Sequence, residues 1–146
     1  MKILIVENDP NKSTQVETFL NEEFSSMNIC IETKKSFQSG LEAILSNKYD
    51  FLILDMSLPT FDITESDDGG ETLDRGGDII LQEMEREDVK YKSVILTQYE
   101  EFGGISLNEI DAALKKEFNE FYLGCIYYNT IQVNWQNELK RIILNL

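Results

Sequence analysis

The chain of 146 residues contains no histidine, only two cysteines and no apolar run long enough to cross a bilayer. The missing histidine excludes Ser-His and Cys-His catalysis and any metal site built on imidazole. Cys30 and Cys125 both lie in apolar stretches. We therefore expect reduced core residues of a cytoplasmic protein, and neither a disulfide nor a cysteine-held metal.

Basic residues are also scarce, because 13 Lys and Arg oppose 27 Asp and Glu, for a formal net charge of −14 at pH 7. This charge disfavours binding to nucleic acid or to an anionic membrane surface, and it favours basic protein partners. The length is typical of one domain with a sizeable core. We expect a single domain over residues 1–146, with no nucleic-acid or membrane partner.

Three short apolar runs each end in polar side chains. They are Ile3–Val6 followed by Glu7, Asn8 and Asp9, Phe51–Leu54 followed by Asp55, and Val94–Leu96 followed by Thr97. Such runs are typical of strands buried on both faces of a parallel sheet. The carboxyl ends of neighbouring strands in such a sheet open onto one crevice, where ligands bind. The converging carboxylates and hydroxyl could hold a divalent cation and accept a phosphoryl group.

Strand-like and helical segments alternate along the chain. The expected strands cover residues 2–6, 28–33, 50–55, 93–97 and 123–128. Helical spacing of apolar residues predicts helices at about 12–25, from Ser36 or Phe37, after Gly76-Gly77, at about 107–118, and from Asn134 onward. Five successive strand–helix units predict a parallel sheet with helices on both faces.

One acidic segment, at about 60–75, interrupts this alternation, and it has neither a helical nor a strand period. It exceeds the usual length of a connection in such folds. It leaves the third strand beside Asp55 and should hang over the crevice. We favour a solvated, partly disordered loop; the alternative is a lid or a partner-binding loop. The spacing of its acids does not match an EF-hand calcium loop.

Together these segments resemble a receiver domain of the two-component response regulators. The matching pieces are Lys2–Pro10, Tyr49–Pro59, Gly76-Gly77 and Val94–Thr97. The resemblance implies a flavodoxin-like, doubly wound α/β fold, with a five-stranded parallel sheet in the order 2-1-3-4-5 and helices on both faces.

The resemblance also implies roles for the residues at the crevice. Asp55 would accept a phosphoryl group, as a carboxylate nucleophile, from a histidine kinase or a phosphotransfer protein. Thr97 would turn toward the phosphoryl oxygens and report the modification near the 107–118 helix. Mg²⁺ would offset the gathering negative charge. Its implied ligands are Glu7, Asn8, Asp55 and the backbone carbonyl of Ser57, with Asp9 as a further candidate.

The chain departs from the receiver pattern at two places. Asn8 stands where most receivers have an acid, so the expected Mg²⁺ site loses one charge. Receivers carry a lysine at the end of the fifth strand, where this chain has Tyr128; Cys125 takes the usual place of a switch aromatic. An ammonium is therefore missing there, unless another element supplies a cation, and Arg75 is one candidate.

Two functions follow. The first is a stand-alone receiver in a phosphorelay, a signalling module and not an enzyme, that acts by protein contact through helix 107–118, strand 123–128 and the last helix. The alternative is a pseudo-receiver that serves as a phosphorylation-independent protein-interaction module. A phosphohydrolase of the Asp-x-Asp type would need an acid at the place of Ser57.

Overall fold

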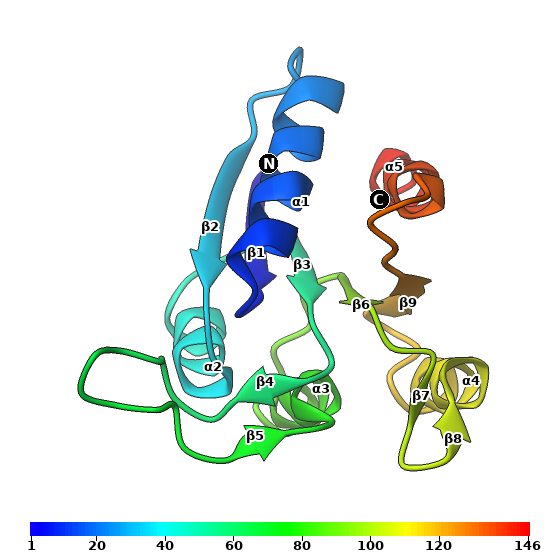
Figure 1. Ribbon diagram of the computed structural model, residues 1–146. Coiled ribbons are helices and arrows are strands. Elements are labelled where there is room, and N and C mark those ends of the chain that lie inside the picture. The colour runs from blue at the N-terminus through cyan, green and yellow to red at the C-terminus, as the bar shows by residue number, and fades with distance from the viewer.

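The computed structural model describes residues 1–146 and contains a five-stranded parallel sheet (Figure 1). In spatial order its strands are β2 (Cys30–Lys34), β1 (Lys2–Val6), β3 (Phe51–Leu54), β6 (Ser93–Thr97) and β9 (Tyr122–Tyr127). Because β6 and β9 are the fourth and fifth strands of this sheet along the chain, the order is the predicted 2-1-3-4-5. The flavodoxin-like α/β fold is confirmed.

Five helices cover the two faces of the sheet. They are α1 (Pro10–Glu23), α2 (Phe37–Ser46), α3 (Gly76–Arg86), α4 (Leu107–Glu117) and α5 (Asn134–Leu144). Along β1, Ile3 and Ile5 pack in one core with α1 and α5, whereas Leu4 and Val6 pack in the other with α2, α3 and α4. The three central strands β1, β3 and β6 bury both faces, which explains their continuous apolar runs.

The start of α1 matters for the site. Asp9 caps this helix, because its Oδ1 accepts a hydrogen bond of 2.9 Å from the backbone N–H of Asn11. Pro10 occupies the first helical position, where its missing N–H costs nothing. The helix therefore begins two residues earlier than predicted, and only a short turn separates it from the carboxyl end of β1.

The acidic segment is ordered, so the expectation of a partly disordered loop is wrong. It extends from an antiparallel hairpin of β4 (Leu58–Pro59) and β5 (Thr72–Leu73) beside α2 (Figure 1). The backbone N–H of Phe61 donates to the carbonyl of Gly69 at 2.9 Å. Gly69 has a positive φ of 88°, which favours glycine. Backbone pairing and turn chemistry, which carry no hydrophobic period, order the segment.

A second, smaller hairpin was not predicted. It joins β7 (Glu101–Phe102) to β8 (Ile105–Ser106) just before α4. Gly103 and Gly104 make its turn with φ values of 59° and 83°, as expected of the Gly-Gly dipeptides that close tight hairpins.

The two cysteines differ in burial. Cys125 is half-buried, but Cys30 is exposed at the first residue of the edge strand β2, so its assignment to the core is wrong. No helix of the chain has both the length and the apolar character to span a bilayer.

Candidate functional site

The carboxyl ends of β1, β3 and β6 open onto a cavity of about 210 Å³. All five residues predicted for the metal site line it: Glu7, Asn8, Asp9, Asp55 and Ser57. The acidic segment and its hairpin contribute four further lining residues, Pro59, Ile63, Asp68 and Thr72. The segment thus forms one wall of the cleft.

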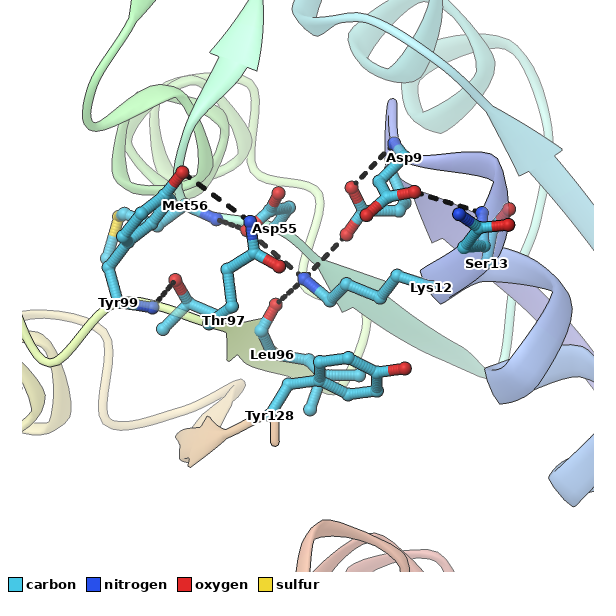
Figure 2. Close-up of polar contacts among 12 residues, drawn as sticks. Asp9, Lys12, Ser13, Asp55, Met56, Leu96, Thr97, Tyr99 and Tyr128 are labelled. Carbon is cyan, nitrogen blue, oxygen red and sulfur yellow. Dashed lines mark hydrogen bonds and ion pairs between the residues drawn. The ribbon is translucent and has the colours of Figure 1, made fainter. Parts of the chain in front are cut away.

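The main residue missing from the prediction is Lys12. Its side chain reaches from α1 to Glu7 and Asp55, two of the residues that line the cavity, and is only 3% exposed (Figure 2). Its Nζ lies 2.6 Å from Glu7 Oε1 and 3.3 Å from Asp55 Oδ1, and donates to the carbonyl of Leu96 at 2.6 Å. A buried ammonium therefore stands between the two carboxylates and the end of β6.

A signal for Lys12 was present in the sequence. Lys12, Val16 and Leu20 follow one another at four-residue steps, and all three are buried against the sheet. Residues spaced in this way share one face of a helix. A lysine in line with an apolar stripe, beside a run of acidic residues, predicts a charged group directed inward.

Tyr128, at the position of the expected lysine, directs no polar atom to the cleft. It is 2% exposed, and its hydroxyl donates to Gln15 Oε1 at 2.6 Å. The Lys12 ammonium lies 5.5 Å from the centre of its ring. Burial, reinforced by Asp9 and Glu7, raises the pKa of Tyr128, so it remains a neutral phenol. Its ring lies beside the Lys12 cation, at a distance typical of a cation–π contact.

Asp55 is buried next to like charge. It is 9% exposed, and its Oδ1 accepts the backbone N–H of Met56 at 2.8 Å in addition to its contact with Lys12. Burial raises the pKa of Asp55 to about 7; the Lys12 ammonium opposes this rise and the Glu7 carboxylate adds to it. Both contacts use Oδ1, which leaves Oδ2 for another ligand.

Thr97 ends β6 with its side chain fully buried. Its hydroxyl accepts the backbone N–H of Tyr99 at 3.3 Å, and its carbonyl accepts the backbone N–H of Tyr128 at 2.7 Å. It therefore connects the cleft edge of β6 to the end of β9, next to the carbonyl of Leu96 that holds Lys12.

Comparison with known proteins finds full-length relatives, although no family model matches the sequence. The chain is 30% identical over 151 residues to the uncharacterised protein y4jR of Sinorhizobium fredii, covering 100% of this chain and 99% of that protein. It is 27% identical over 152 residues to the Detocs response regulatory protein DtcB of Enterobacter cloacae, covering 100% of each.

Solved structures with the same fold are receiver domains. That of a putative LuxO repressor from Vibrio parahaemolyticus has a TM-score of 0.65 at 17% identity, covering 98% of this chain and 86% of that one. That of the sensor histidine kinase PA1611 from Pseudomonas aeruginosa has a TM-score of 0.62 at 17% identity, covering 99% and 94%, and has magnesium coordinated in its active-site cleft. The chain has the fold of the receiver domains of response regulators, and one of its sequence relatives is a response regulatory protein.

Receiver domains are modules of two-component signalling, and magnesium in the cleft is typical of this family. In this receiver, no group of three acidic, cysteine or histidine side chains is arranged around one point. Mg²⁺ does not require such a cage, because it usually binds through one or two carboxylates, keeping waters and phosphate oxygens as its other ligands. The two carboxylates, the amide and the backbone carbonyl at this cleft fit that mode of binding.

Arg75 does not provide the cation that this receiver lacks on β9. Its Nη2 lies 2.6 Å from Asp78 Oδ2, and this ion pair spans the first turn of α3. Lys12, and not Arg75, supplies the positive charge beside Asp55.

Proposed function

We propose that this receiver accepts a phosphoryl group on Asp55, with Mg²⁺, from a histidine kinase or a phosphotransfer protein, and then signals by protein contact. The observation that carries the proposal is the buried carboxylate of Asp55, which shares one cleft with the carboxylate of Glu7 and the ammonium of Lys12. A carboxylate held in this way can act as a nucleophile toward phosphorus.

The transfer begins with Asp55 ionised. Because burial raises its pKa to about 7, the nucleophile is mostly charged only above that pH. An Asp55 oxygen attacks the phosphorus atom of a phosphohistidine. The new O–P bond forms as the P–N bond breaks, and the electron pair of that bond stays on the imidazole nitrogen of the donor. When bound, Mg²⁺ supplies positive charge to the phosphoryl oxygens.

The proposed Mg²⁺ ligands are Glu7, Asn8, Asp55 and the carbonyl of Ser57. Asp9 is a weaker candidate, because its Oδ1 already caps α1. One oxygen of Asp55 and one of Glu7 contact Lys12. Asp55 can therefore offer Oδ2 to a metal. Glu7 Oε2 accepts the backbone N–H of Asp9 at 3.0 Å and keeps a second lone pair for a metal.

We propose that Thr97 is the switch and that the output surface lies at α4, β9 and α5. A cavity of about 240 Å³ opens among these elements, lined in part by Leu107, Cys125, Tyr127 and Trp135. The net charge of −14 favours a kinase or target that presents a basic surface.

The alternative, a pseudo-receiver that binds proteins without phosphorylation, depended mainly on the missing lysine. The buried ammonium of Lys12 weakens that argument, because the cleft has a cation of its own. Phosphoryl acceptance is therefore the better-supported function.

The test is to incubate the protein with acetyl phosphate and Mg²⁺ and to measure its intact mass. We expect the mass of one phosphoryl group to be added to the wild type and nothing to be added to Asp55→Asn. An adduct that persists in Asp55→Asn, or a wild type that takes up nothing, would count against the proposal.

A further inference from the structure

Lys12 is buried at an electrostatic cost that its surroundings have to offset. Removing an ammonium from water costs several kcal/mol, by order of magnitude, unless partners replace the water. The three partners of Lys12 are Glu7 Oε1, Asp55 Oδ1 and the carbonyl of Leu96. They match the three N–H donors of an ammonium, so Lys12 has a complete set of partners at the point where the phosphoryl group would arrive.

The position of Lys12 in its helix is otherwise unfavourable. It is the third residue of α1, whose first turn contains no acid. A cation near the amino end of a helix opposes the helix dipole. A buried residue that is unfavourable for the helix that carries it is expected mainly at functional sites.

The end of β9 lacks the lysine of the receiver pattern, and a lysine from α1 lies beside it instead. β9 ends in an aromatic ring, Tyr128, and α1 carries the ammonium that lies 5.5 Å from the centre of that ring. The Tyr128 hydroxyl is used by Gln15 on α1, so the ring and not the hydroxyl lines the side of Lys12. A lysine at position 128 would compete with Lys12 for the same carboxylates.

We infer that Lys12 is the phosphoryl-binding lysine of this receiver, supplied by α1 instead of by the end of the fifth strand. This inference rests on the proposed phosphorylation of Asp55. Once the O–P bond has formed, the ammonium keeps all its protons and turns one N–H from Asp55 Oδ1 to a phosphoryl oxygen. Its contact with the carbonyl of Leu96, one residue before Thr97, couples that movement to the switch strand.

The test compares three variants with the wild type. Lys12→Met removes the charge and keeps the length of the side chain. Lys12→Met/Tyr128→Lys moves the lysine to the place that the family pattern assigns to it. Lys35→Met removes an exposed lysine from the same edge of the sheet and is the matched control for net charge. For each protein, intact mass gives the rate of phosphoryl uptake from acetyl phosphate, and a titration gives the Mg²⁺ affinity.

We expect Lys12→Met to slow phosphoryl uptake by at least about tenfold, the loss typical of one charge-assisted hydrogen bond. Its Mg²⁺ affinity should be equal or higher, because the carboxylates of Glu7 and Asp55 are released from the ammonium. The double variant should recover part of the rate, and Lys35→Met should match the wild type. A purely structural role would weaken Mg²⁺ binding and phosphoryl uptake together.

Uptake by Lys12→Met at the wild-type rate would overturn the inference while leaving phosphorylation of Asp55 intact. Loss of Mg²⁺ binding together with uptake would also overturn it, since the lysine would then only hold the cleft in shape. A wild type that takes up no phosphoryl group would overturn the proposed function itself, and this inference with it.

Discussion

Strand β9 has a polar network on each side, and the two networks differ in character. Toward α1, Lys12 lies between the carboxylates of Glu7 and Asp55. Toward α4, Asp111 Oδ1 accepts the hydroxyl of Tyr122 at 2.7 Å and the backbone N–H of Cys125 at 2.9 Å. The first network is made of buried charges beside a cleft. The second is partly buried, joins a helix to a strand, and has one ion pair, from Asp111 Oδ2 to the exposed Lys115 at 3.0 Å.

The two networks differ in whether their groups can still change charge or bind a further ligand. Burial raises the pKa of the Cys125 thiol to about 12 and also raises that of Tyr122, so both stay neutral around one carboxylate whose partners are in place. Asp55, with its pKa near 7, changes charge within the ordinary working range of a protein. The α4 side is therefore a fixed support, and the cleft side is the part that can respond to a ligand.

Of the changes considered, removing Asp111 should have the largest effect on stability, because it breaks the network on the α4 side. We expect Asp111→Ala to lower the free energy of unfolding by about 2–3 kcal/mol, because two buried donors lose their acceptor. Asp111→Asn keeps an acceptor oxygen and should cost less. Urea denaturation measures both. A loss as large for Asn as for Ala, or no loss in either, would contradict the role given to this carboxylate.

Removing the charge of Asp55 should stabilise the protein, whereas removing Asp111 should destabilise it. The pKa of its carboxyl is raised on folding, so the native state holds the proton more tightly than the unfolded state does, and stability falls as pH rises from about 4 to 7. Asp55→Asn should therefore raise the free energy of unfolding by about 1–2 kcal/mol above pH 7 and by almost nothing near pH 4. Denaturation curves at the two pH values measure the difference; a gain that is equal at both would contradict the electrostatic origin.

Tyr128→Phe removes the hydroxyl and keeps the ring, so it distinguishes the contributions of the two groups. The hydroxyl bonds Gln15, whereas the ring lies beside Lys12 and Trp135. We expect a loss of about 1 kcal/mol in the free energy of unfolding, with phosphoryl uptake unchanged. Tyr127→Phe, at an exposed position of the same strand, is the control and should cost nearly nothing. A large fall in uptake would show that the hydroxyl, and not the ring, serves the cleft.

The sheet was predictable because its three central strands bury both faces and so form unbroken apolar runs, such as Phe51–Leu54. The cleft residues were predictable for the same reason, since each directly follows one of those runs. Both hairpins were missed, because Gly69 and the Gly103-Gly104 pair act through backbone conformation, which leaves no hydrophobic period.

Lys12 was missed for a different reason. A lysine in a helix usually indicates a solvated face, and only its spacing to Val16 and Leu20 places it inward. The receiver pattern places this lysine at the end of the fifth strand, so the ammonium was expected there. The physical requirement is a positive charge at one point in space, which a neighbouring element can meet as well as the expected strand.

The smallest expected effect adds a charge to the cleft side. Asn8 lines the cavity with Glu7 and Asp55, and a carboxylate there would give Mg²⁺ a third anionic oxygen. Asn8→Asp should tighten Mg²⁺ binding by about three- to tenfold at a pH above 7, where Asp55 is charged. Asn11→Asp makes the same change of net charge at an exposed position in the first turn of α1, outside the residues that line the cavity, and should leave the affinity unchanged. Equal tightening in both variants would show a long-range effect of charge and would argue against Asn8 as a ligand; tightening in Asn8→Asp alone would place the metal beside it.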